Sequence, residues 1–195
     1  MKLFDTLLGR TKPAKANLDS LFALPSVAIN LSVAGFTPSG EAGVCVKPAS
    51  SASFDEAENQ IRALLTDDAP AGSQEAPAAP PSLRTQSDNY GYQWLVIEDA
   101  DLSDLVTKIH MVNTTLAEAG WETQLLCSVF GLSSNDGTAY LVYLYKRGTF
   151  YPFAPRGTER RDNALELRVQ GLVEGDLPVE SDLTRWFPLW GLPIR

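Results

Sequence analysis

Apolar positions near the N-terminus recur at helical spacing. Leu3, Phe4, Leu7 and Leu8 would share one side of a short helix, so that residues 1–16 form an amphipathic segment and a polar linker. A helix of this length buries too little apolar surface to be stable alone. We therefore expect the segment to dock on its own domain, on a partner or on a membrane surface.

The stretch that follows, up to residue 66, alternates between helical and extended patterns. Ser53 and Glu56 have the spacing of a capping box and begin the clearest helix, whose apolar face runs to Leu65. Partial alternation of apolar residues predicts two strands, and glycines with a proline predict the turn between them. The elements expected here are helices over 17–24 and 53–65 and strands over 27–33 and 44–46.

Residues 67–82 have an unusual composition, with four prolines, five alanines and almost no large apolar side chain. Such a segment cannot bury enough surface to offset the entropy of ordering it, which predicts a disordered loop. The preceding residues offer only two strands and one long helix, too little for an independent core. We therefore expect a long loop inside a single domain over 17–195, and not a linker between two domains.

The second half of the chain has stronger patterns. Asp101 is placed to cap a helix whose apolar stripe runs from Leu102 to Leu116. Residues 140–145 are apolar or aromatic at every position, so their strand should lie inside the sheet. Further strands are expected over 90–97, 125–132, 138–145 and 165–169, the middle two as a hairpin. Because hairpins outnumber βαβ units, the sequence predicts an α+β domain with a mostly antiparallel sheet backed by helices.

The net charge of −8 is unevenly distributed along the chain. Residues 1–17 sum to +3 and residues 146–161 to +4, so the remainder is strongly acidic. Nucleic-acid binding needs a wide basic face and is not expected. The two basic segments leave an anionic membrane surface or an acidic protein as the expected targets.

Two features of the sequence concern the location of the protein. There is no apolar run of about 18 residues that could span a bilayer, and the first residues lack the pattern of a secretory signal. We expect a cytoplasmic protein in a reducing compartment, with Cys45 and Cys127 as buried free thiols.

Few residues could form a reaction centre. His110 is the only histidine, and its place at the edge of a helix stripe favours a half-exposed structural role. A Cys127–His110 pair is the catalytic alternative, and it requires an exposed Cys127 with the helix packed over its strand. The spacing of the histidine, cysteines, acids and glycines matches no zinc, calcium or nucleotide site, so neither a metal nor a cofactor is expected.

Basic and aromatic residues alternate in the segment after the hairpin, as they do at binding surfaces. The candidates for partner contact there are Lys146, Arg147, Phe150 and Tyr151, joined by Arg160 and Arg161. Trp186 and Trp190 near the C-terminus form a second candidate binding patch. In both segments the alternative is that the aromatic side chains complete the core while the charged ones are solvated.

Six stretches of the sequence carry a family resemblance. They are FDTLLGR (residues 4–10), YGYQWLV (90–96), LLCS (125–128), LVYLYKRGTFYPFAP (141–155), ERRDNALEL (159–167) and RWFPLWG (185–191). Together they resemble the PspAB family, the PspA-associated proteins of actinobacteria. The resemblance covers nearly the whole chain apart from residues 67–82, and its most specific part is the stretch 141–155.

The resemblance implies an accessory protein of the phage-shock, or envelope-stress, system. The implied partner is PspA, a coiled-coil protein that acts at the inner face of the membrane. No catalytic residues are implied, and a fold like that of YbjN-like proteins and secretion chaperones is expected by analogy only. The predicted function is a non-catalytic adaptor that binds a PspA-like coiled coil. The alternatives are a peripheral membrane-surface protein and a cysteine-dependent enzyme that uses Cys127 and His110.

Overall fold

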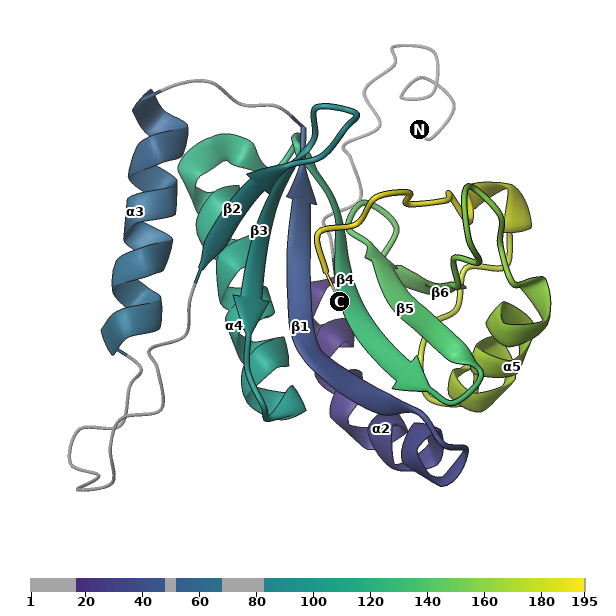
Figure 1. The fold of residues 1–195 in the computed structure, drawn as a ribbon. Coiled ribbons are helices and arrows are strands. Elements are labelled where there is room, and N and C mark those ends of the chain that lie inside the picture. The colour runs from purple at the N-terminus through teal and green to yellow at the C-terminus, as the bar shows by residue number, and fades with distance from the viewer. Residues whose placement is uncertain (1–16, 48–51, 68–82, 195) are drawn as a thin grey trace, which may run out of the picture.

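The computed structural model describes residues 17–47, 52–67 and 83–194. These residues form an open six-stranded antiparallel sheet in the order β2–β3–β1–β4–β5–β6 (Figure 1). The predicted α+β class with a mostly antiparallel sheet is confirmed. The N-terminal segment 1–16 and residues 68–82 lie outside the described residues. The strands are β1 (Thr37–Val46), β2 (Arg84–Ser87), β3 (Gln93–Glu98), β4 (Leu125–Ser134), β5 (Gly137–Leu144) and β6 (Thr149–Phe153).

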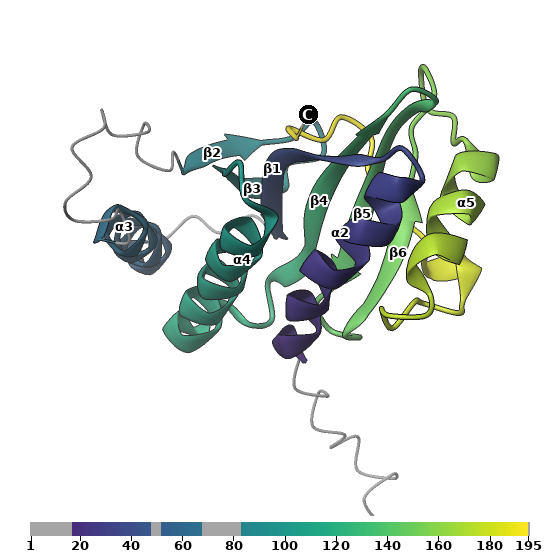
Figure 2. The same cartoon turned by 90° about the horizontal axis from the view of Figure 1, so that it is seen from below.

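Helices cover one face of this sheet. Figure 2 shows α2, α4 and α5 on one side of the strands and the C-terminal segment on the other, while α3 packs beside α4. Among the described residues, no helix combines the length and the apolar character needed to cross a membrane. The helical elements are η1 (Leu18–Ala23), α2 (Leu24–Val33), α3 (Ala52–Asp67), α4 (Leu102–Leu116), η2 (Ala117–Trp121), α5 (Asn163–Val173) and η3 (Leu183–Arg185).

Alternation along the strands places apolar side chains on both faces of the sheet. On β3, for example, Leu95 and Ile97 join the core under the helices, whereas Trp94 and Val96 join a second core on the opposite face. The interior position predicted for residues 140–144 is confirmed, because β5 lies between β4 and β6. Both faces must therefore be covered, and the helices of the described residues pack on only one of them.

Residues 27–33 form most of helix α2, so the predicted strand there is wrong. Pro25, which directly follows the helix expected over 17–24, lies in the first turn of α2. Proline is tolerated at that position because the N–H it lacks would have no partner inside the helix. Val27 and Leu31 are buried four residues apart, which is helical spacing.

Residues 165–169 belong to helix α5, so the predicted strand is wrong here too. Leu165, Leu167 and Val169 alternate with polar residues, but Asp162 caps a helix by accepting a hydrogen bond from the Leu165 N–H at 3.1 Å. Leu165 and Val169 are buried against the helix-side core, while Leu167 is 58% exposed. Packing of one helical stripe therefore overrides the two-residue alternation.

The strands extend beyond the predictions at several places. β1 starts at Thr37 and contains Gly40 and Gly43. These glycines were expected to form a turn before the strand. Gly43 is needed for close packing, since a Cβ at this position would lie 3.0 Å from the Ile194 Cδ1 atom. The strands β2 and β6 were not predicted. Pro152 fits β6 because an edge strand has no second neighbour that needs its N–H.

The helical assignment of α5 predicts unequal effects for two leucines that a strand would place on the same face. Leu165→Ala should lower the free energy of unfolding by about 2–5 kcal/mol, because it removes a buried side chain. The matched change Leu167→Ala removes an exposed side chain and should change it by less than about 0.5 kcal/mol. Urea denaturation of the two variants measures both values, and equal losses would contradict the helix.

Candidate functional site

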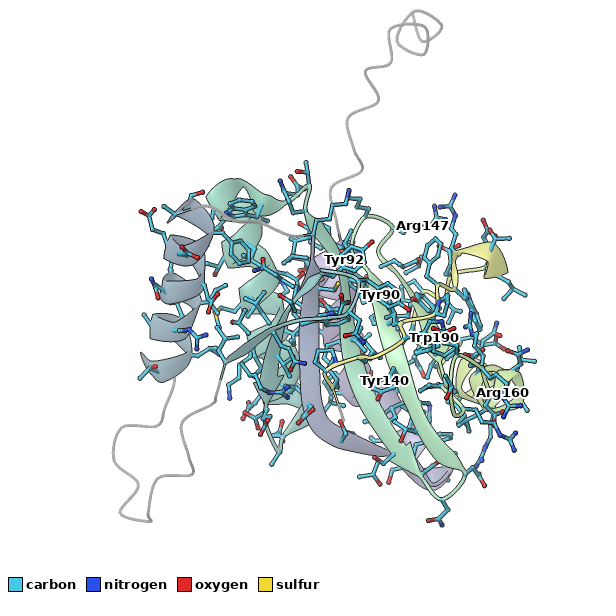
Figure 3. All side chains as sticks on the ribbon, turned by 45° about the horizontal axis from the view of Figure 1, so that its top comes forward. Tyr90, Tyr92, Tyr140, Arg147, Arg160 and Trp190 are labelled. Carbon is cyan, nitrogen blue, oxygen red and sulfur yellow. The ribbon has the colours of Figure 1, made fainter. Side chains whose placement is uncertain are left out.

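A pocket of about 660 Å³ opens on the face of the sheet that carries no helix. We call it the aromatic pocket, because tyrosine, tryptophan and phenylalanine side chains make up much of its lining. Figure 3 shows Tyr90, Tyr92 and Trp190 gathered over the strands, with Arg147 at one end. The lining residues are Cys45, Asp88, Tyr90, Tyr92, Trp94, Leu126, Cys127, Leu144, Lys146, Arg147, Tyr151, Arg185, Phe187, Pro188, Leu189 and Trp190.

The floor of the pocket is built from strand residues that belong to the core on the face without helices, which we call the second-face core. Cys45 and Cys127 are opposite each other in the register of β1 and β4. Trp94 lies on β3 next to β1, and Tyr151 lies on β6, beyond β5. The register shifts between Cys45 and Val46, where Leu126 is an extra residue on β4. Such a bulge lets consecutive residues of one strand turn toward the same side, which brings Leu126 to the floor beside Cys127.

One wall of the pocket is the turn between β2 and β3. Asp88 organises this turn by accepting hydrogen bonds from the backbone N–H groups of Tyr90 and Tyr92, both at 2.9 Å. Its second carboxylate oxygen accepts from the Trp94 indole N–H at 3.0 Å. Gly91 adopts a φ of 82°, which favours glycine. The turn therefore holds two exposed tyrosines above the floor.

The opposite wall is the C-terminal segment around residues 187–190. The Tyr151 hydroxyl donates to the Phe187 carbonyl at 2.8 Å, and burial raises the pKa of Tyr151, so the proton needed for this bond is retained. Trp190 packs edge-on against Phe153 with 5.2 Å between ring centroids. Beyond the pocket, the Tyr140 hydroxyl donates to the Ile194 carbonyl at 3.0 Å. These anchors hold an irregular segment in place as a wall.

Charged residues lie around the rim, and most of them are paired. Arg147 forms an ion pair with Glu180, which also accepts hydrogen bonds from the Thr149 hydroxyl and the Asp182 N–H. Burial acts to raise the pKa of Glu180, but these hydrogen bonds outweigh it and hold the pKa below its ordinary value. Hydrogen bonding to Glu180 raises the pKa of Arg147 in turn.

The remaining rim cations differ in their partners. Arg185 pairs with Asp182 at 3.1 Å. The Lys146 ammonium donates to the Thr123 carbonyl at 3.1 Å and forms no ion pair with the described residues. Lys146 is therefore the rim cation best able to pair with a carboxylate from outside.

Four of the eight predicted contact residues meet in the aromatic pocket. Lys146 and Arg147 lie at its rim, Tyr151 at its floor and Trp190 in its wall. Their convergence was not evident from the sequence, because about 40 residues separate Tyr151 from Trp190. Tyr90, Tyr92 and Phe187 were not predicted to line the site, although the alternation of Tyr90, Tyr92 and Trp94 is a signal that indicates part of this wall.

The other four predicted contact residues have different positions. Phe150 is fully buried among the helix-side core residues and has no surface to offer a partner. Trp186 is also buried, with its indole N–H donating to the Glu180 carbonyl at 2.9 Å. Arg161 binds Glu166 at 2.8 Å and the Trp186 carbonyl, while Arg160 is exposed beside α5, apart from the pocket (Figure 3). Leu3, Phe4, Leu7 and Leu8 lie outside the described residues.

The Cys127–His110 pair considered from the sequence is not formed. His110 lies on α4, where it contacts the ring of Phe22 at 4.8 Å between ring centroids and faces Asp19. Cys127 belongs to the core on the opposite face of the sheet. Both cysteines are buried free thiols, as predicted. The described residues contain no group of three or more histidine, cysteine or acidic side chains able to hold a metal ion.

Comparison with known families gives a match over nearly the entire chain. The family model described as PspA associated protein B matches residues 1–194. The chain belongs to the PspA-associated protein B family. This assignment confirms the resemblance found in the sequence and supports an association with the PspA system. Searches of curated proteins and of solved structures found no match to this PspA-associated protein.

Removing either partner of the Arg147–Glu180 pair should have unequal effects. Arg147→Leu leaves the Glu180 carboxylate, which is 1% exposed, without its charged donor, whereas Glu180→Gln leaves a half-exposed guanidinium that water can solvate. Arg147→Leu should therefore lower the free energy of unfolding more than Glu180→Gln does. Urea denaturation at neutral pH measures the difference, and the reverse order would contradict this account of the rim.

The same pair predicts how stability depends on pH. Because the pKa of Glu180 in the folded state lies below 4.5, the stabilisation from its carboxylate is complete above pH 4.5 and is lost as the pH falls through the folded-state value. Wild-type protein should therefore lose stability below pH 4.5 more steeply than Glu180→Gln. Parallel pH profiles for the two proteins would show that Glu180 is not held ionised by the rim.

Proposed function

We propose that this protein is a non-catalytic adaptor of the PspA system, and that a helical segment of a PspA-like coiled-coil partner binds in the aromatic pocket. The observation that carries the proposal is a solvent-open, largely apolar pocket on a member of a family named for its association with PspA. Binding to PspA would bring the protein to the inner face of the membrane.

The size and lining of the pocket favour an amphipathic helix as the occupant. A volume of about 660 Å³ lies within the range of about 300–1,000 Å³ typical of ligand sites. It accommodates more than one side chain, as when a helix inserts apolar residues from successive turns into a groove. Tyr90, Tyr92 and Trp190 present rigid aromatic surfaces of the kind that dominate binding energy at interfaces.

The rim charges favour an acidic residue beside the apolar stripe of the partner. The carboxylates of Asp88, Glu180 and Asp182 all accept hydrogen bonds from donors of this chain. Lys146 pairs with none of them. A carboxylate on the partner helix could reach Lys146 while the apolar side chains occupy the floor, which would orient the helix across the pocket.

The chemistry of the pocket supports binding in preference to catalysis. Its lining holds two thiols, one carboxylate and three cations. His110, the only imidazole of the chain, is on the opposite side of the sheet. A nucleophile with an adjacent base is therefore not assembled among the described lining residues.

A second surface offers a rival docking site for a helical partner. Ile29 and Val33 are 69% and 87% exposed on α2, one helical turn apart, and Phe22 is half exposed on the preceding turn η1. These side chains lie on the helix layer, so the sheet separates them from the aromatic pocket. Variants on the two surfaces can therefore distinguish the sites.

Two sets of changes at the pocket should weaken the binding of PspA. Tyr90→Ala combined with Tyr92→Ala removes one aromatic wall, and Lys146→Glu reverses the charge of the unpaired cation. All three residues are exposed, so the fold should be preserved. Each variant should raise the Kd for purified PspA about tenfold or more, as expected when an interface hot spot is lost. Isothermal titration calorimetry measures the change.

The controls carry matched changes away from the pocket. Arg160→Glu makes the same charge reversal beside α5, and Phe22→Ala combined with Ile29→Ala removes apolar surface from the helix layer. Both controls should bind PspA like the wild type. Loss of binding only in the Phe22 and Ile29 variant would move the docking site to the helix layer. Absence of binding by the wild-type protein would overturn the adaptor hypothesis.

A further inference from the structure

The floor of the aromatic pocket holds the two cysteines of the chain side by side. Cys45 of β1 and Cys127 of β4 are direct partners in the antiparallel register, and both side chains belong to the second-face core. Both thiols are free and buried. Two cysteines 82 positions apart in the sequence thus meet on one face of the sheet, and docking of a helix does not account for the pair.

The positions of the two cysteines are compatible with a disulfide bond. Opposite residues of antiparallel strands have Cα atoms about 4.5–5.5 Å apart, within the range of about 4.4–6.8 Å that disulfides span. The Cβ atoms of such opposite residues are about 4.5–5.5 Å apart. This separation is slightly larger than the Cβ–Cβ distance of roughly 3.5–4.5 Å in a disulfide. The bulge at Leu126 interrupts the regular ladder next to the pair, where a small inward shift of the strands is easiest.

The aromatic pocket gives reagents a route to the thiols. Cys45 and Cys127 are 3% and 5% exposed, and both line the aromatic pocket. Their neighbours in the lining include Trp94, Tyr151 and Leu144, which make the route apolar and aromatic. The reagent best matched to this route is a small, uncharged disulfide with aromatic substituents.

We propose that Cys45 and Cys127 form a site of thiol–disulfide exchange, at which a small aromatic disulfide entering the pocket converts the two thiols into an intramolecular disulfide. In the first step one protein sulfur, after losing its proton, attacks a sulfur of the small disulfide, and one small thiol leaves with that proton. In the second step the other protein sulfur attacks the mixed disulfide, and a second small thiol leaves with the second proton. Two electrons pass from the protein sulfurs to the small disulfide.

Contact between the two thiols influences their reactivity. The interaction with Cys127 and then burial raise the pKa of Cys45. A thiol must lose its proton before it attacks a disulfide, so oxidation of the pair should become faster as the pH rises.

The reaction can be followed on the reduced full-length protein with dithiodipyridine, which releases a coloured thione at each step. With one equivalent of reagent, wild-type protein should release two thiones per chain. Its intact mass should fall by two hydrogen atoms, and peptide mapping should join Cys45 to Cys127. Cys45→Ser should stop after one thione with a stable adduct on Cys127. Cys127→Ser should likewise stop after one thione, with a stable adduct on Cys45.

A second pair of variants tests the route to the thiols. Leu126→Trp fills part of the floor and should slow the reaction at least severalfold, whereas Leu183→Trp on an exposed turn outside the pocket should react like the wild type. Equal rates in both variants would exclude the pocket as the route. Wild-type protein that reacts only after unfolding, or that carries a separate adduct on each cysteine without an internal disulfide, would overturn the proposal.

Discussion

Both faces of the sheet carry large apolar side chains, so each face needs a layer that shields it from water. This need for two covering layers determines how the rest of the chain is arranged. Helices α2, α4 and α5 cover one face, and their apolar stripes enclose a continuous core. The opposite face carries Trp94, Tyr151 and Phe153, which would expose a large apolar surface to water if left open. In the described part of the chain, this face is covered by a largely irregular segment after residue 177.

An irregular covering segment must be fixed by discrete bonds, since it lacks a ladder of its own. It starts beside β6, where the Phe150 N–H donates to the Pro178 carbonyl at 2.8 Å and the Glu180 N–H donates to the Phe150 carbonyl at 2.7 Å. It then accepts hydrogen bonds from the hydroxyls of Tyr151 and Tyr140. Near its end the segment passes close to the turn that carries Tyr90 and Tyr92, since a Cβ on Gly191 would lie 3.8 Å from the Asn89 side chain. The aromatic pocket lies between these two irregular walls, over a floor of strand residues.

The sequence predicts elements best where local signals agree with packing. The capping aspartate and apolar stripe of α4, and the hairpin of β4 and β5, could be predicted because cap, turn and burial all indicate the same element. For α2 and α5 the local alternation indicates strands, and only the neighbouring core shows that Leu31 and Val169 pack as helical residues. Predictions failed where the periodicity was ambiguous over a few residues.

The candidate site was predictable in its chemistry and not in its geometry. Interleaved basic and aromatic residues after β5 indicated a binding surface, and Lys146, Arg147 and Tyr151 do line the pocket. The same pattern also contains Phe150, whose side chain points to the opposite face because neighbours on a strand alternate. The other half of the lining comes from residues 88–94 and 185–190, and nothing in the linear sequence shows that these segments face each other across the sheet.

Helix docking and thiol–disulfide exchange would compete for the aromatic pocket. A helix seated in the aromatic pocket would cover Cys45 and Cys127, which line it. A bound partner should therefore protect the thiols, and the thiols should react most readily in protein that has no partner. The bonds of Tyr151 to Phe187 and of Tyr140 to Ile194 hold the covering segment in place while the pocket remains open to solvent. The incomplete cover is thus sufficient for stability and leaves the floor available for binding.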